Sequence, residues 1–471
     1  MPPTGSMAPK LEGPRLEGPS SEGGPLRSSA ETPGAVVDRS ERYLIVGAGP
    51  AGLAQARAFK RAGIAFDQIE RHRDLGGIWD IDNPGTPMYR SARFISSKRR
   101  SAFLGFPMPA DYPDYPDHGR VLAYVRRFAE TEGLVEDIAF GTGAEWIEPD
   151  GEGLWSLRLD RGPRRLYRGV VCANGMTWTP QRPEIRGHFD GELRHAVSYS
   201  DAAAYRGRRV LVIGGGNTGC DIACDLTRQA VATTLSLRRG YHVIPRHLLG
   251  LPADVFGAAL PGLPLRLQQS ASQGLLRLLR GNPRRRGWPE PDHRIYESHP
   301  IINSEILDLV GSGSLRLKPD VEAFDGQEVR FRDGSHAAFD TVLLATGYKM
   351  TIPFMDPAHF AWAQDRIAGF LTAFNARHRS LFTLGFLAIN AGVFGDFDRL
   401  AHLVTQHVRD QDENPARAEA FRRIVETETP DLTGGLSLVP SPRHAVYAHN
   451  PTFRAYVETL RRRMGWPPFP G

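Results

Sequence analysis

The sequence is poor in cysteine and has no long apolar run. Only three of its 471 residues are cysteine, namely Cys172, Cys220 and Cys224. Three thiols are too few for a disulfide framework, and they lack the paired spacing of a zinc site. No stretch reaches the roughly 20 apolar residues that a membrane-spanning helix needs. We therefore expect a chain of a reducing, cytoplasmic setting, with no structural metal and no membrane partner.

The chain also lacks a strong excess of one charge. Lysine and arginine number 58 against 53 aspartate and glutamate residues, which gives a formal net charge of +5. This near balance provides no electrostatic reason to expect a nucleic-acid partner. A hydrophobic content of 41% over 471 residues leaves room for two or three packed domains, and hence for an enzyme.

Two parts of the chain repeat one pattern, in which a short apolar strand enters a glycine-rich turn and a helix follows. The first has a strand at 43–47, a helix at 52–61 and a strand at 65–70; the second has a strand at 209–214, a helix at 219–230 and a strand at 233–239. Both read as βαβ units. We predict an α/β fold with two Rossmann-like dinucleotide-binding domains, in which a strand at 341–345 returns to the first.

The first glycine turn reads Gly47-Ala-Gly49-Pro50-Ala51-Gly52 and fits the pattern G-x-G-x-x-G. Its glycines permit a tight turn, close approach of the backbone to a pyrophosphate, and close packing of helix on strand. Glu70 lies 23 residues past Gly47, where an acid binds ribose hydroxyls. A bare tight turn is the alternative, but the flanking strand and helix favour a dinucleotide site.

The second turn, Gly214-Gly-Gly216-Asn217-Thr218-Gly219, has a basic residue at the place of Glu70. Arg238 lies 24 residues past Gly214, and Arg239 follows it. An arginine there suits the 2′-phosphate of NADP and removes the acid expected for NAD. The alternative is that both arginines are only solvated at a strand end. Two dinucleotide sites indicate electron transfer between a flavin and a nicotinamide, although spacing alone does not decide which site holds FAD.

A further segment lies just ahead of the second turn and resembles a known fingerprint. Phe189, Gly191, His195 and Tyr199 fit F-x-G-x-x-x-H-x-x-x-Y/F of the class B flavoprotein monooxygenases. Core or linker roles for His195 and Tyr199 are the alternative. The order of other motifs resembles the flavin-containing monooxygenases in particular: Gly76-Gly-Ile-Trp79, Phe106-Pro-Met-Pro, Asp111-Tyr-Pro-Asp-Tyr-Pro116, His299-Pro300 and Ala345-Thr-Gly347-Tyr348.

This resemblance implies both cofactors and their residues. FAD is expected at the first turn and NADPH at the second, with His195 and Tyr199 in a linker between domains. Trp79 and Tyr348 could equally be packing residues. The FAD set is Gly47, Gly49, Pro50, Ala51, Gly52, Glu70, Gly77, Trp79, Thr346 and Gly347. The NADPH set is Gly214, Gly216, Asn217, Thr218, Gly219, Arg238 and Arg239.

The resemblance also implies the reaction, in which one oxygen atom of O2 passes through a C4a-hydroperoxyflavin to a nucleophilic nitrogen or sulfur of a small substrate. Ile95 departs from the family, because many relatives carry asparagine there; Ser96 still matches. Both should line the flavin and nicotinamide site, while the acid and base, if any, stay unassigned. The alternatives are Baeyer–Villiger oxygenation of ketones, an NADPH oxidase that releases hydrogen peroxide, and a cofactor-binding module without turnover.

The predicted boundaries follow from these motifs. A disordered tail is expected at 1–40, a first FAD-binding part at 41–180, an NADPH-binding domain at 181–335, and a second FAD-binding part with C-terminal helices at 336–471. The arginine-rich stretch 277–286 is interpreted as a solvated loop in preference to a site for an acidic substrate. A homodimer is considered, but the sequence fixes neither the substrate nor the oligomeric state.

Overall fold

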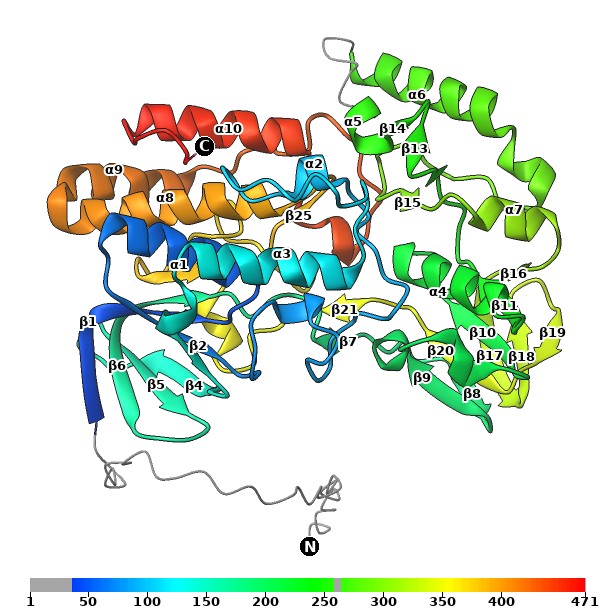
Figure 1. The fold of residues 1–471 in the computed structure, drawn as a ribbon, viewed down its shortest axis with the longest axis horizontal. Coiled ribbons are helices and arrows are strands. Elements are labelled where there is room, and N and C mark those ends of the chain that lie inside the picture. Colours follow the sequence, from blue (N-terminus) through cyan, green and yellow to red (C-terminus); the bar gives the residue numbers. More distant parts are fainter. Residues whose placement is uncertain (1–35, 258–263, 471) are drawn as a thin grey trace, which may run out of the picture.

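The computed structural model describes residues 36–257 and 264–470. It contains two main sheets, each covered by helices, which lie side by side in Figure 1. The first sheet has the strand order β3-β2-β1-β6-β5-β4, and β24 also pairs with β6; the second has the order β16-β11-β10-β20-β9. The predicted α/β fold with two dinucleotide-binding units is confirmed.

The first unit is built around the buried strand β1. Tyr43, Leu44 and Ile45 of β1 are almost fully buried, as expected for a strand covered on both faces. β1 pairs in parallel with β2 and β6. The elements are β1 (Val36–Val46), α1 (Pro50–Ala62), β2 (Phe66–Glu70), α3 (His118–Thr131), β3 (Ile138–Phe140), β4 (Ala144–Pro149), β5 (Trp155–Leu159), β6 (Arg164–Cys172) and β24 (Leu381–Thr383).

The second unit repeats this arrangement, with α4 packed beside β10 and β11. Cys220 and Cys224 lie on the buried face of α4, where burial raises the pKa of the Cys224 thiol to about 12. They are therefore small buried residues, as predicted. The elements are β9 (Glu192–His195), β10 (Arg209–Ile213), α4 (Asn217–Arg228), β11 (Ala232–Ser236), α7 (Ile306–Gly311), β16 (Arg316–Lys318) and β20 (Thr341–Leu344), beside a small sheet of β8 (Arg186–Phe189), β17 (Val321–Gly326), β18 (Glu328–Phe331) and β19 (His336–Ala338).

The strand that returns to the first sheet is not the one predicted. Residues 341–344 form β20, which pairs in parallel with β10 and β9 inside the second sheet. β20 pairs with β10 on the side opposite β11, and its side chains are buried. The return is made by β24, which pairs with β6. Three residues without periodicity give too little signal to identify such a strand from sequence.

The chain passes between the units at one small antiparallel pair. β7 (Thr179–Pro180), which leaves the first unit, pairs with β21 (Tyr348–Lys349), which leaves the second. The predicted interdomain crossing at 179–183 therefore lies where both connections meet. We call this pair the crossing.

Two sequence interpretations change in the structure. Residues 36–40 belong to β1, where Val36 pairs with Arg164, so this end of the predicted tail is a strand; residues 1–35 lie outside the described part. The stretch 277–286 is not a loop, because 265–280 form α6 (Leu265–Arg280) and Pro283–Arg286 form a 3-10 turn. Arg280 and Arg286 both pair with Asp308 of α7, which anchors the end of α6.

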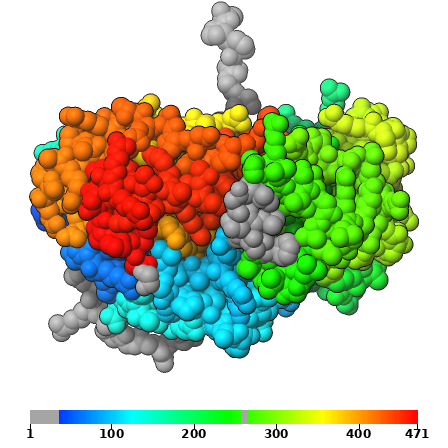
Figure 2. All heavy atoms as spheres, turned by 90° about the horizontal axis from the view of Figure 1, so that it is seen from above, coloured from blue at the N-terminus to red at the C-terminus, as the bar shows by residue number. Residues whose placement is uncertain are grey.

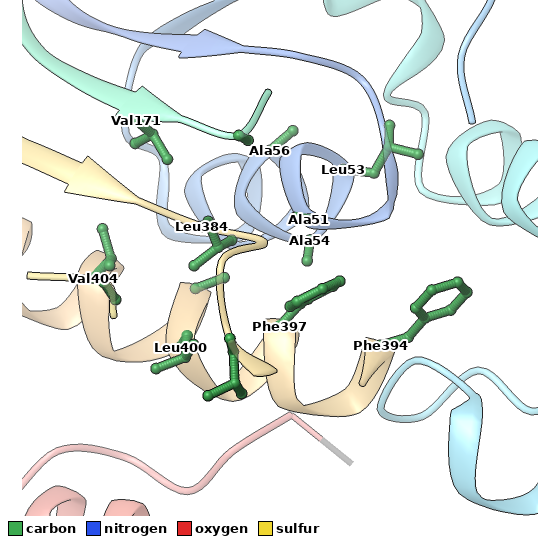
Figure 3. Packing of buried hydrophobic residues seen from close by; sticks show 14 of the residues in the cluster. Ala51, Leu53, Ala54, Ala56, Val171, Leu384, Phe394, Phe397, Leu400 and Val404 are labelled. Carbon is green, nitrogen blue, oxygen red and sulfur yellow. The ribbon is translucent and has the colours of Figure 1, made fainter. Parts of the chain in front are cut away.

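The C-terminal third forms three helices that cover the first unit: α8 (Phe394–Glu413), α9 (Pro415–Thr427) and α10 (Asn450–Arg463). The face of α8 with Phe397, Leu400 and Val404 packs on α1, as Figure 3 shows. Within the described residues, no helix combines the length and apolar character needed to span a bilayer.

A buried ion pair joins α1 to α8. The guanidinium of Arg57 lies 2.5 Å from the carboxylate of Asp398, and their side chains are 3% and 1% exposed. Asp398 also accepts a hydrogen bond from Leu104 N at 2.7 Å, and Arg57 donates to Leu104 O at 3.1 Å. The pair thus fixes α1, α8 and the loop at Leu104 relative to one another.

We predict that Asp398→Ala lowers the free energy of unfolding by about 1.5–3 kcal/mol, because it removes the nearer carboxylate of the buried Arg57 and leaves only Glu132, 3.6 Å away. Denaturant unfolding measures this loss. Glu413→Ala, which removes an exposed ion pair with Arg409 on the same helix, is the control and should cost less than about 1 kcal/mol. Equal effects of the two substitutions would contradict the prediction.

Candidate dinucleotide sites

The first glycine turn connects the end of β1 to the start of α1. Gly47 has φ +111, and a Cβ at that position would lie 2.6 Å from Ala173 O. A Cβ on Gly52 would lie 2.0 Å from Gly47 O. Both contacts exclude any side chain, so α1 approaches the strand as closely as its backbone permits. Pro50 occupies the first turn of α1, where its missing N–H is not needed.

The space in front of this turn suits a phosphate. The N-cap of α1 is Gly49, which provides no side-chain cap, so N–H groups of the first turn are free for an anion. Ala51 is buried in that turn. Gly77 packs against the glycine turn, since a Cβ on Gly77 would lie 3.1 Å from Gly49 Cα. The structure therefore brings Gly77 to the first turn.

Glu70 ends β2 beside the same turn. Its carboxylate is buried and accepts hydrogen bonds from Ala48 N at 2.7 Å and from His72 N at 2.9 Å. These bonds fix an acceptor at the carboxyl end of β2, next to the first turn. A carboxylate at this position suits ribose hydroxyls.

The second turn has the same construction. Gly214 has φ +123, and a Cβ on Gly219 would lie 2.0 Å from Gly214 O. The N-cap of α4 is Gly216, which again provides no side-chain cap. Thr218 is half-buried in its first turn. The two glycine patterns therefore produce two equivalent anion-binding turns, one on each sheet.

The polar residues of the second turn differ in their surroundings. Asn217 is occupied by the protein, since its amide donates to Pro300 O at 3.1 Å and accepts from Ile302 N at 2.8 Å. Arg239 lies 3.8 Å from Asp292. Arg238 is exposed and makes no ion pair within the described residues. Of these three side chains, Arg238 is the one available to an added phosphate.

Thr346 and Gly347 do not lie at the first turn, where the resemblance placed them. Ala345 N donates to Ile213 O at 2.8 Å, and a Cβ on Gly214 would lie 2.4 Å from Ala345 O. Both residues thus follow β20 beside the second turn. Thr346 Oγ1 donates to Gln181 O at 2.5 Å, on the crossing. Their position is a consequence of β20 belonging to the second sheet.

The corresponding neighbours of the first turn are Ala173 and Gly385. Ala173 follows β6 and contacts Gly47, while a Cβ on Gly385 would lie 3.0 Å from Ala51 Cβ. Gly385 follows β24 and has φ +90. Sequence reasoning missed Gly385, although Leu384-Gly385-Phe386 after an apolar strand was a usable signal.

The fingerprint residues support the joint between the units. His195 ends β9, accepts from Val197 N through Nδ1 at 3.1 Å, and contacts Gly347 O through Nε2 at 3.0 Å. Burial lowers the pKa of His195, so the ring is neutral and Nε2–H donates to Gly347 O. Tyr199 Oη donates to Asp225 of α4 at 2.6 Å. Phe189 packs on Phe324, and a Cβ on Gly191 would lie 2.7 Å from Asp340 O.

Trp79 and Tyr348 are distinguished by their surroundings. Trp79 is buried among aromatic rings, with its centroid 4.5 Å from that of Phe94 and 6.4 Å from that of Phe394. Tyr348 lies at the crossing, and its buried Oη has no hydrogen-bond partner within the described residues. Burial raises its pKa to about 12, so the phenol keeps its proton. Trp79 packs against these rings, whereas Tyr348 presents an unused donor.

Ile95 follows Phe94 at the edge of this aromatic group and is half-buried. The hydroxyl of Ser96 lies 2.8 Å from that of Ser101. Ser97 N donates to Asp254 at 2.7 Å, although Ser97 Oγ and Asp254 Oδ1 are buried without partners. The segment 95–101 therefore touches the second unit and carries unused polar atoms.

The chain is similar to known proteins in sequence and in fold. Residues 40–435 match the family described as flavin-binding monooxygenase-like. Indole-3-pyruvate monooxygenase YUCCA1 of Oryza sativa subsp. japonica is 32% identical over 70% of this chain and 80% of its own. Flavin-containing monooxygenase 3 of Homo sapiens is 28% identical over 67% of this chain and 63% of its own. A cyclohexanone-bound cyclohexanone monooxygenase shares the fold, with a TM-score of 0.67 and 16% identity over 91% of this chain and 98% of that one.

We predict that Gly52→Ala and Gly219→Ala act on different cofactors, because each added Cβ would lie 2.0 Å from a carbonyl oxygen of its own turn. Gly52→Ala should yield protein without bound flavin. Gly219→Ala should keep its flavin and bind NADP⁺ at least about tenfold more weakly, a change of only about 1.4 kcal/mol. Flavin absorbance and a NADP⁺ titration measure the two effects.

The control is Gly274→Ala in α6, where an added Cβ meets nothing within 4 Å. It should retain both cofactors, since alanine is the better helix former by about 1 kcal/mol. The opposite pattern, with flavin lost from Gly219→Ala and retained by Gly52→Ala, would reverse the assignment of the two turns.

Proposed function

Because the chain belongs to the flavin-binding monooxygenase-like family, whose cofactors are FAD and NADPH, it is a flavin-dependent monooxygenase, and we propose that it uses NADPH to oxygenate a nucleophilic nitrogen or sulfur of a small organic substrate. The observation that carries the proposal is the pair of uncapped glycine turns on two sheets joined at one crossing. The short fingerprint ending in His195 and Tyr199 supports nitrogen or sulfur over a ketone carbon.

When bound, the cofactors supply the redox chemistry, with hydride from the nicotinamide and activation of O2 by the flavin. In our proposal the first turn and Glu70 hold FAD, through the pyrophosphate and ribose, and Gly77 allows close approach. Glu70 is suited to this because it stays fixed by two backbone N–H donors. The residues present thus fit the cofactor.

The second turn is proposed to hold NADPH, with Arg238 on the 2′-phosphate. Arg238 is exposed and free of ion pairs within the described residues, as a phosphate-binding arginine must be before its ligand arrives. Gly214, Gly216 and Gly219 leave room for the pyrophosphate, whereas Asn217 acts indirectly by holding Pro300 and Ile302.

The joint between the units is proposed to orient the two cofactors. His195 fixes Gly347, and Tyr348 next to it has a free phenol donor. We propose that the 95–101 segment, which bonds to Asp254, lies along the flavin and nicotinamide site, where it would limit the access of water. In this proposal Thr346 and Gly347 contribute to the nicotinamide side.

Oxygenation at a carbonyl carbon is the second candidate. The observation in its favour is that a relative at 32% identity is named for indole-3-pyruvate, a 2-oxo acid. A ketone, a 2-oxo acid, a tertiary amine such as N,N-dimethylaniline and an aryl methyl sulfide, each supplied with NADPH and ¹⁸O2, separate the two. Label in an N-oxide or sulfoxide supports the main proposal, whereas label in an ester or a decarboxylated acid supports the second.

We predict that Ile95→Asn improves the coupling of NADPH oxidation to oxygenation. An isoleucine gives no polar contact at a position that lies beside Ser96 and the aromatic group, and an added amide supplies one. The fraction of NADPH that appears as hydrogen peroxide should fall at least about twofold, by roughly the contribution of one hydrogen bond. Ile95→Leu is the matched control and should leave that fraction unchanged.

If wild-type protein converts all its NADPH to hydrogen peroxide with every substrate class, and Ile95→Asn does not alter this, the oxidase alternative replaces the monooxygenase proposal for this chain.

A further inference from the structure

A cation from the C-terminal part of the chain reaches the second glycine turn. Among the described residues outside its own turn and helix, Arg443 Nη1 is the only atom within 4 Å of the place that a Cβ on Gly216 would take, at 4.0 Å. Gly216 is the N-cap residue, directly before the first residue of α4. Arg443 therefore faces the amino-terminal end of this helix, 227 positions further along the sequence. No glycine motif or family pattern identified it beforehand.

Arg443 has no acidic partner within the described residues. It forms no ion pair there, and the groups that act on its charge are Tyr447 and Tyr241, which are neutral phenols. The side chain is accessible to solvent, yet the protein around it desolvates it and so lowers its pKa. A guanidinium that faces a helix start and has no carboxylate partner is suited to bind an anion.

The surroundings add positive charge. Arg366 donates from Nε to Pro442 O at 3.3 Å, and burial together with Arg443 lowers its pKa. The amino-terminal end of α4 carries the positive end of a helix dipole. Arg443 and the helix end therefore place positive charge at Gly216, and Arg366 adds to it from beside Pro442, an arrangement that repels cations and attracts phosphates.

The segment that carries Arg443 is fixed at both sides. Val439 N donates to Glu297 O at 2.8 Å in the second unit, and Tyr447 pairs with Ala388 through β26 (Tyr447–Ala448) and β25 (Ala388–Ile389). We call residues 439–448 the strap. Figure 2 shows the orange and red C-terminal part of the chain against the green second unit.

A chain of hydrogen bonds connects the strap to the turn itself. His299 Nδ1 lies 3.1 Å from Tyr447 Oη. The next residues, Pro300 and Ile302, bond to the side chain of Asn217, the first residue of α4. The position of Arg443 relative to the turn is thus set by the structure on both sides of it.

We propose that Arg443 binds the pyrophosphate of the nicotinamide cofactor at the second turn. The inference rests on the proposed function, because it takes that turn to be the NADPH site. The pyrophosphate is the ligand because it sits at the helix start in this fold, whereas the 2′-phosphate belongs at the end of β11, where Arg238 lies. The strap therefore closes the NADPH site with a residue from outside the second unit.

Substitutions of Arg443 and Arg238 should affect the two nucleotides differently, since NAD⁺ and NADP⁺ share the pyrophosphate and differ in the 2′-phosphate. In flavin-loaded protein, Arg443→Gln should weaken NADP⁺ and NAD⁺ by the same factor, about 10- to 100-fold. Arg238→Gln should weaken NADP⁺ alone. Equilibrium titration with each nucleotide, at two salt concentrations, measures both, and the salt dependence of binding should fall for each variant that loses a phosphate contact.

Arg443→Lys should restore part of the affinity, because it keeps the charge and loses the planar fork. Arg409→Gln, on the exposed face of α8, is the matched control and should change neither affinity. Flavin content and thermal unfolding establish that each variant is folded.

Unchanged affinities in folded Arg443→Gln overturn the inference while leaving the proposed function in place, provided that wild-type protein binds NADP⁺. A loss confined to NADP⁺ also overturns it, since Arg443 would then contact the 2′-phosphate. Failure of wild-type protein to bind either nucleotide contradicts the proposed function itself, and the inference with it.

Discussion

The architecture depends on a backbone contact that only glycine permits. In each unit the third glycine of the motif lies so close to the first that an added Cβ would be 2.0 Å from its carbonyl oxygen. This contact brings the first turn of the helix onto the end of the strand and leaves its N–H groups open to an anion. The proposed roles of the residues around the two turns, including Glu70 and Arg238, depend on where these helices start.

The units are joined by few but specific bonds. β7 and β21 pair at the crossing, and the strap joins Glu297 to Ala388 through Val439 and Tyr447. His195 bonds to Gly347 beside the crossing, within the second unit. The fingerprint therefore has a structural role, since a neutral His195 positions the crossing and is not arranged as an acid or base.

Much of this was predictable because strong local patterns carried it. The apolar runs before Gly47 and Gly214, and the helices after them, follow from periodicity and glycine alone. The incorrect strand assignment has a physical cause, because local sequence does not specify which strands pair. Val342 and Leu343 suit either sheet, so the strand predicted at 341–345 to return to the first sheet lies in the second, and Thr346 and Gly347 lie there with it.

Arg443 and Gly385 were missed for the same reason, because their roles come from neighbours distant along the chain. The arginine-rich stretch 277–286 is predicted as a loop from its charge, whereas its first residues end helix α6. Sequence thus predicted the two turns well, and it predicted poorly what approaches them from elsewhere.

The central claim is that electrons pass from NADPH at the second turn to a flavin at the first. Rapid mixing of the flavin-loaded protein with NADPH in the absence of oxygen, followed by flavin absorbance, tests it most directly. The account predicts full bleaching of the flavin by one equivalent of NADPH, and much slower bleaching by NADH at the same concentration. A flavin that stays oxidised in the presence of bound NADPH would contradict it.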